Sequence, residues 1–185
     1  MKRIWIFCCI VIAVISFSAT AQNEHKFHSI NSGGIVFGES KAADIFQTVN
    51  GIQFSKWYSG IGIGFDTYNY NTLPLFFDAR RYFGKKDKGF LYADLGYDLP
   101  LKNVPGKEIT YYNTYHFKGG LYTDIGIGYK IKFIKSSSLL FMLGHSYKEL
   151  QTQIGITPGC AECQTSSYKY EFGYGRIILK TGVEF

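Results

Sequence analysis

The sequence predicts an all-β fold: an eight-stranded antiparallel up-and-down transmembrane β-barrel that follows a cleavable signal peptide. Three observations support this prediction. Apolar and polar residues alternate along most of the chain, as they do in strands with two different faces. The alternating runs reach the roughly 9 to 11 residues that a membrane-crossing strand needs. The longest connections between the runs fall at one end of the predicted barrel, as they do in transmembrane barrels.

Residues 1–21 have the pattern of a secretory signal peptide. Two basic residues, Lys2 and Arg3, precede an apolar run that ends at Phe17, and small residues lead up to Ala21. The run is shorter than the roughly 20 residues of a membrane-spanning helix. We therefore expect cleavage after Ala21, because a charged start, a short apolar centre and small residues define such a peptide.

Cleavage would leave residues 22–185 as one outer-membrane β-barrel domain. These 164 residues suit a single domain, and the loss of two basic residues lowers the formal charge from +6 to +4. Aromatic residues make up 18% of the chain, which contains 21 Gly and only 4 Pro, so strands and tight turns are favoured. The remaining positive charge alternates along strands and forms no basic patch, so we expect no nucleic-acid partner.

The strands are delimited by clusters of Gly, Asn, Asp and Ser. The first two alternate least cleanly, since Ile35, Val36 and Phe37 form a continuous apolar run in the first. The next three alternate more clearly, and in the third Ile61 and Ile63 share an apolar face. The first five expected strands are 30–40, 46–58, 60–69, 73–83 and 90–99.

The last three strands show the longest alternation. In the sixth, a series from Leu121 to Phe133 lies on one face, with charged and small residues on the other. In the seventh, Leu139, Phe141 and Leu143 share a face. The last three expected strands are 118–133, 138–149 and 170–185.

The connections between these strands test the model independently, because transmembrane barrels place short turns on the periplasmic side and longer loops outside. The even-numbered connections are compact: Ser59, residues 84–89 and residues 134–137. The two longest, near 100–117 and 150–169, are the fifth and seventh. Both fall on the outer side if the N-terminus is periplasmic.

The last strand ends the chain on Phe185. Leu179 and Val183 share the parity of this residue, whereas Lys180 and Glu184 have the opposite parity. The terminal Phe resembles the C-terminal recognition signal of Gram-negative outer-membrane barrels. The whole mature chain likewise resembles the small eight-stranded OmpA/OmpX-type barrels and the outer membrane β-barrel domain family, within the porin-like superfamily.

This resemblance implies a location in the cell outer membrane. It implies two partners, the outer-membrane lipid and the barrel assembly machinery, with Phe185 as the C-terminal assembly signal. An extracellular protein or glycan is a further expected partner class. The resemblance is architectural and specifies no activity.

The inward faces, assigned by parity with Phe185 outward, carry six acids and five bases. An eight-stranded barrel is just wide enough for side chains to fill it, and buried charges must be paired or hydrogen-bonded. We therefore predict a polar charge network that closes the lumen, in preference to an ion path. Its predicted members are Asp66, Asp78, Arg80, Asp94, Asp98, Asp124, Lys130, Lys132, Arg176, Lys180 and Glu184.

Two cysteines in the seventh connection, Cys160 and Cys163, are the only ones left after cleavage. A local disulfide is the favoured interpretation, because exported proteins meet an oxidising compartment. A redox-active pair lacks the usual βαβ context. A metal site would need further ligands, for which His116 and Glu162 are the obvious candidates.

An outer-membrane enzyme acting on lipid is the main alternative. His145 and Ser146 invite comparison with the His-x-Ser motif of eight-stranded lipid A deacylases, but here the two residues are adjacent. Adjacent side chains in a strand point to opposite faces, so they would not share one site. We predict no catalytic residue, and His145 is expected at the outward interfacial band.

Two smaller groups of residues each have two interpretations, and one alternative fold fits the same periodicity. His25 and His28 form a His-x-x-His pair that we assign to a solvated N-terminal tail in preference to a metal site. The aromatic residues of the fifth connection suit an interfacial girdle, or a contact surface for a partner or glycan; they are Tyr111, Tyr112, Tyr115, His116 and Phe117. A soluble lipocalin-like barrel would show the same periodicity with the two faces exchanged.

The function predicted from these observations is that of an integral outer-membrane barrel without catalytic activity. It would act in envelope structure or bind partners through its external loops. We expect no cofactor and no bound metal. The alternatives are a lipid-modifying enzyme and the lipocalin-like ligand-binding barrel.

Overall fold

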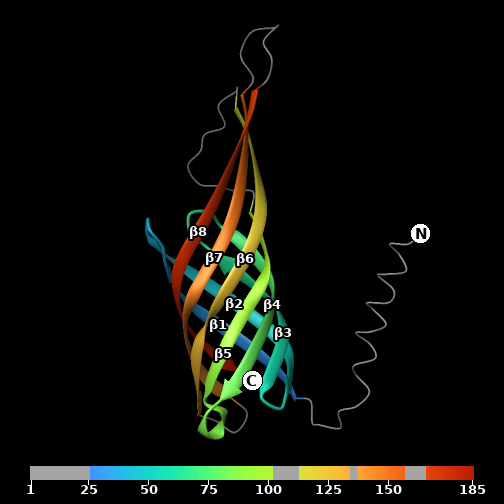
Figure 1. The fold of residues 1–185 in the computed structure, drawn as a ribbon, viewed down its shortest axis with the longest axis vertical. Helices are drawn as coiled ribbons and strands as arrows, with labels where there is room; N and C mark the ends of the chain where they lie inside the picture. The colour runs from blue at the N-terminus through green and yellow to red at the C-terminus, as the bar shows by residue number, and fades with distance from the viewer. Residues whose placement is uncertain (1–25, 102–112, 134–136, 157–165) are drawn as a thin grey trace, which may run out of the picture.

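The chain forms a closed eight-stranded β-barrel in which every strand is antiparallel to its neighbours (Figure 1). The computed structural model describes residues 26–101, 113–133, 137–156 and 166–185. Strand order follows the chain, and the last strand pairs with the first to close the barrel. The predicted eight-stranded antiparallel barrel is thereby confirmed. Its strands are β1 (Lys26–Phe37), β2 (Ala42–Phe54), β3 (Trp57–Asp66), β4 (Thr72–Phe83), β5 (Gly89–Pro100), β6 (Asn113–Lys132), β7 (Ser138–Ile156) and β8 (Ser166–Glu184).

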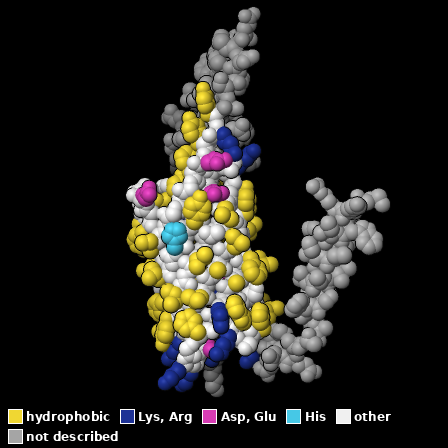
Figure 2. Space-filling view, in the orientation of Figure 1, with side chains coloured by type: hydrophobic (Ala, Val, Ile, Leu, Met, Phe, Trp, Pro, Cys, Tyr) yellow, Lys and Arg dark blue, Asp and Glu magenta, His cyan; other side chains and the backbone are white. Residues whose placement is uncertain are grey.

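The strands keep their apolar side chains on the outside of the barrel. Large apolar residues are exposed along all eight strands, and Ile61, the most exposed of them, is 73% accessible. Figure 2 shows them spread over the wall of the barrel, with Lys and Arg at its lower end and in a second group near its upper end. This arrangement excludes the lipocalin-like alternative, which requires the apolar face inside and the charged face outside.

Several inward positions are glycines that make room for aromatic rings from a neighbouring strand. A Cβ atom placed on Gly128 would lie 2.2 Å from the ring of Phe90, and one on Gly62 would lie 2.4 Å from the ring of Phe76. Such distances are far below van der Waals contact, so a side chain at either glycine would displace the ring. Pairing aromatic residues with glycines across strands lets large rings fill a narrow lumen.

The ends of the barrel differ in their connections. One end, which we call the short-turn end, carries the β2–β3 turn at Ser55 and Lys56, the β4–β5 turn and the β6–β7 connection. The β4–β5 turn contains the short 3₁₀ helix η2 (Lys85–Asp87). The predicted turn at Ser59 is wrong, because the left-handed backbone of Ser55 (φ 56°) reverses the chain earlier and leaves Ser59 inside β3.

The opposite end, which we call the long-loop end, carries the fifth and seventh connections. Both are shorter than predicted, because β6, β7 and β8 continue beyond the other strands. The β5–β6 ladder ends at Asp98 and Gly120, whereas the β6–β7 ladder continues to Asn113 and Ile156. The three strands therefore form an extension above the barrel, visible at the top of Figure 1.

No helix in the described part of the chain combines the length and the apolar character needed to cross a membrane.

Candidate functional site

The barrel interior holds the densest group of charged side chains in the described part of the chain. The inward strand positions bury six acids and four bases almost completely. They form three groups along the barrel axis: one near the long-loop end, one at mid-height and one at the short-turn end. The buried charged residues are Asp66, Asp78, Arg80, Asp94, Asp98, Asp124, Lys148, Arg176, Lys180 and Glu184.

The buried charges differ from the predicted network at three lysines. Lys130 is partly buried, with 12% of its side chain exposed. Lys132 is exposed and lies outside the buried group, because it is the last residue of β6, where the barrel wall ends. Lys148, which was not among the predicted members of the charge network, is fully buried. Lys148 has the same parity along β7 as the inward Leu140 and Met142, so its inward position could have been predicted from the sequence.

Near the long-loop end, Asp66 of β3 binds two cations from β7 and β8. It forms ion pairs with Arg176 and, at 3.3 Å, with the Nζ atom of Lys148. Arg176 also donates a hydrogen bond to the Oγ atom of Ser146 at 2.8 Å. Asp98 lies farther away, with 4.0 Å between its Oδ2 atom and the Lys148 Nζ atom. All these groups are removed from solvent, so their electrostatic interactions are little screened by salt.

At mid-height, three aspartates occupy directly opposed positions on three neighbouring strands. Asp78 of β4 faces Asp94 of β5, which in turn faces Asp124 of β6. Three buried carboxylates this close repel one another unless cations lie between them. Lys180 of β8 reaches two of them, at 2.6 Å from Asp124 and 3.8 Å from Asp94.

Asp78 is paired with Arg80, two residues along the same strand. The Arg80 side chain donates hydrogen bonds to both carboxylate oxygens, at 2.8 to 3.0 Å. Its guanidinium lies 5.4 Å from the centre of the Phe90 ring and 5.7 Å from that of Tyr58. Aromatic faces attract a desolvated cation, so the ion pair is held between rings inside the barrel.

Neutral polar side chains complete the central group. Gln47 accepts a hydrogen bond from Lys180 at 2.8 Å and donates one to the Tyr122 hydroxyl at 2.8 Å. The Tyr92 hydroxyl donates to Asp124 at 3.0 Å. These contacts join β2, β5, β6 and β8 across the lumen. Buried polar groups of this kind are stable only when most of their bonds are formed.

At the short-turn end, Glu184 connects three neighbours. It forms an ion pair with Lys130, lies 3.1 Å from the Nδ1 atom of His28 and accepts a hydrogen bond from the Tyr82 hydroxyl at 3.4 Å. His28 was predicted to lie in a solvated tail; this prediction is wrong, because β1 begins at Lys26 and pairs His28 with Gly51 of β2. Together these residues form the inner wall of a vestibule.

The vestibule has a volume of about 930 Å³ and opens at the short-turn end. Its walls carry the basic side chains of Lys26, Lys86, Lys130 and Lys132, together with Asp87 and Glu184. Tyr82, which is 1% exposed, closes its inner side. The ring of Phe90 packs above Tyr82 with the ring centres 5.5 Å apart.

The motif that prompted the enzyme alternative does not form a site. His145 is exposed on the outer wall, whereas Ser146 is fully buried and bound to Arg176. Within the described residues, no group of three or more His, Cys, Asp or Glu side chains is arranged to hold a metal ion. Cys160 and Cys163 lie outside the described residues, and so does His25.

The extension at the long-loop end carries a row of aromatic residues on β8. Tyr170, Phe172 and Tyr174 alternate along the strand with their rings stacked, and the neighbouring ring centres are 6.3 and 6.4 Å apart. Tyr170 is 48% exposed and Phe172 is 37% exposed. Of the aromatic residues predicted near the fifth connection, Phe117 belongs to β6 and packs against Tyr70 at 5.5 Å.

Neither a family model nor a curated protein matches this sequence. Among solved structures, the outer membrane protein AlkL, determined by solid-state NMR in DMPC lipid bilayers, matches with a TM-score of 0.50 and 11% identity. The match covers 91% of this chain and 92% of AlkL. The outer membrane protein OprG from Pseudomonas aeruginosa matches with a TM-score of 0.49 and 9% identity, over 86% of this chain and 95% of OprG. The closed eight-stranded sheet and the match to AlkL show that the chain has the fold of a small outer-membrane β-barrel.

Proposed function

We propose that this protein is an integral outer-membrane barrel of the OmpA/OmpX type, with no catalytic activity and with a lumen closed by its polar side chains. The observation that carries the proposal is the distribution of side chains, which is the reverse of that in a soluble protein. Apolar side chains such as Ile61 and Leu95 face outward, whereas ten charged side chains are buried inside. An exposed apolar belt is unfavourable in water and is stabilised when lipid surrounds it.

A closed lumen is supported by contacts that cross the interior between strands that are not neighbours in the sheet. Lys180 of β8 reaches Gln47 of β2 and Asp124 of β6, and Arg176 of β8 reaches Asp66 of β3. An eight-stranded barrel leaves no space for a water-filled channel once such side chains meet. We therefore assign the charges a structural role.

The two chain ends support export and assembly. Residues 1–21 carry the signal-peptide pattern, and we propose that they are removed after export. Phe185 continues the β1–β8 ladder, since its N–H donates to Ser29 at 2.9 Å, and its side chain is exposed. We propose that this accessible ring is the signal that the barrel assembly machinery recognises.

The first test is whether the mature protein behaves as a membrane-embedded barrel. We expect it to remain in the membrane pellet after carbonate extraction. We also expect faster migration on a gel when unheated than when boiled, because hydrogen-bonded barrels resist detergent until heated. A soluble protein without such a shift would contradict the proposal.

The same folded protein tests the closed lumen when it is inserted into a planar lipid bilayer. We expect no steady conductance above that of the bare bilayer, because paired side chains fill the lumen. A sustained conductance from heat-shifting protein would overturn the closed lumen while leaving the membrane barrel intact.

The external end is the proposed site of partner binding. The aromatic row of β8 lies on the extension at the long-loop end, and aromatic side chains commonly anchor recognition surfaces. In envelope proteins of this fold, long connections face outward and short turns face the periplasm. We therefore propose a protein or glycan partner at this end, or a purely structural role in the envelope.

Orientation can be measured with single cysteines in a background where Cys160 and Cys163 are replaced by Ser. In whole cells, we expect a membrane-impermeant maleimide to label Tyr170→Cys on the extension and to leave Lys56→Cys in the β2–β3 turn unlabelled. Both sites are exposed, so access to the cell exterior alone should separate them. Labelling of Lys56→Cys only would reverse the proposed orientation.

A further inference from the structure

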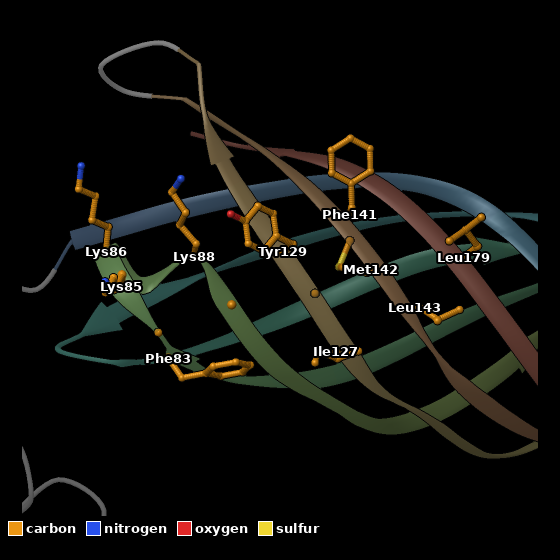
Figure 3. Close-up of a pocket in the computed structure, with 13 residues that line it drawn as sticks. Phe83, Lys85, Lys86, Lys88, Ile127, Tyr129, Phe141, Met142, Leu143 and Leu179 are labelled. Carbon is orange, nitrogen blue, oxygen red and sulfur yellow. The ribbon is translucent and has the colours of Figure 1, made fainter.

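An apolar groove runs along the outer wall of the barrel near the short-turn end. Its volume is about 790 Å³. Four strands contribute outward side chains to it, and Figure 3 shows these lying along the groove. The outward apolar and aromatic side chains that line it are Phe83, Ile127, Tyr129, Phe141, Leu143 and Leu179, and the buried Met142 also borders it.

A glycine in the outward apolar face is one of the residues that line this groove. Gly89 of β5 stands directly between Phe83 of β4 and Tyr129 of β6 in the sheet. Because Gly89 has no side chain, the Phe83 ring can lie across it; a Cβ atom on Gly89 would be 2.6 Å from that ring. The glycine therefore makes room for the Phe83 ring, which lines the groove.

Three lysines of the β4–β5 turn lie at one end of the groove. Lys85, Lys86 and Lys88 all line it and all are exposed. Figure 3 shows Lys86 and Lys88 at the end opposite Leu179. The groove is thus apolar along most of its wall and positively charged at one end. The same turn also contains one acidic residue, Asp87.

The turn that presents these lysines has a constrained backbone. Lys86 and Asp87 both have positive φ angles, 62° and 50°, a conformation that side chains other than glycine rarely adopt. The turn is held to the barrel by a hydrogen bond of 2.7 Å from the Lys130 N–H to the Lys88 carbonyl oxygen. Backbone strain of this kind persists where surrounding contacts maintain it, often at ligand sites.

We propose that this groove binds one anionic phospholipid, with its phosphate against the lysines and an acyl chain along the apolar wall. The assignment rests on the proposed function, since it requires the groove to face lipid. A zwitterionic phospholipid carries its own amine near the phosphate and gains less from three lysines. The short-turn end faces the periplasm in that orientation, so the ligand is a phospholipid of the inner leaflet.

The test is native mass spectrometry of the detergent-solubilised barrel titrated with phosphatidylglycerol or with phosphatidylethanolamine of the same acyl chains. Heat-shifted gel migration of each sample is measured first, so that a failure to form the membrane barrel is recognised separately. We expect one phosphatidylglycerol to bind in preference to phosphatidylethanolamine. Equal retention of the two lipids would overturn the proposal.

A charge-matched pair of variants locates the site. Lys85→Gln/Lys88→Gln removes two groove lysines, whereas Lys56→Gln/Lys132→Gln removes two exposed lysines at the same barrel end that do not line the groove. We expect the first pair to weaken phosphatidylglycerol binding by about tenfold or more, since each lysine near an anionic lipid contributes roughly a fivefold change. Equal weakening by both pairs would mean a diffuse charge effect and would overturn the groove assignment.

Glycerol phosphate distinguishes a lipid site from a phosphate site. We expect millimolar glycerol phosphate not to displace the bound phosphatidylglycerol, because it has no acyl chain to bury in the groove. Displacement by glycerol phosphate at concentrations near those of the lipid would show that the lysines alone bind phosphate, and would overturn the role of the apolar wall.

Discussion

Replacing Lys180 with Met is expected to destabilise the folded barrel by about 3–5 kcal/mol, because removing one partner leaves buried carboxylates uncompensated. Lys180 is the cation nearest to Asp124, and it is also within 3.8 Å of Asp94. Among the contacts between described residues, Asp124 would lose the one to Lys180 and keep the hydrogen bond from the Tyr92 hydroxyl. The measurement is urea unfolding in lipid vesicles, followed by the fluorescence of Trp57.

Two further variants test whether the loss is electrostatic. Lys180→Met/Asp124→Asn removes a carboxylate charge together with the cation, so we expect it to recover part of the lost stability. Lys169→Met removes a lysine from an exposed pair with Glu171 and should change the stability by less than about 1 kcal/mol. A double variant less stable than Lys180→Met alone would contradict the proposed network.

Truncating Phe90 to Ala should cost about 3–5 kcal/mol of stability, as is typical for large aromatic residues in a packed core. Phe90 is fully buried and its ring contacts those of Tyr82 and Tyr92. It also lies beside the Arg80 guanidinium and over Gly128. The same urea titration in vesicles measures the change.

A double-mutant cycle tests the pairing of this ring with its glycine. Gly128→Ala alone should cost about 1–3 kcal/mol, because the new methyl group overlaps the Phe90 ring. In the Phe90→Ala background, the new methyl group enters the space left by the ring. The double variant should therefore lose less stability than the sum of the losses in the two single variants. Gly175→Ala is the control, since its Cβ atom would make only an ordinary contact, 3.4 Å from His145. Strict additivity would contradict the pairing.

Much of the fold follows from local features of the sequence. A strand places alternate residues on opposite faces, so the parity of Phe185 is enough to predict that Lys180 and Glu184 point inward and Leu179 outward. The same rule anticipates that His145 and Ser146 lie on opposite faces. It applied equally to Lys148, whose burial could have been predicted from the parity of β7.

Strand ends were predicted less well, because they depend on pairing partners. Residues 113–117 and 150–156 were assigned to loops, yet they are strands in the structure because β6, β7 and β8 pair with one another beyond the barrel. Lys132 was assigned to the interior by parity alone, but the barrel wall ends at that residue. The alternation along one strand carries no information about how far its neighbours extend.

The sequence by itself therefore determined the number of strands, their direction and which face of each meets the surroundings, because these depend on a two-residue period and on short-range turn signals. Only the tertiary structure decided which charges meet. Asp66 and Arg176 are separated by 110 residues and come together through barrel closure and strand register. The groove on the outer wall has the same origin, since the apolar side chains that line it come from β4, β6, β7 and β8 and meet only when the sheet is formed.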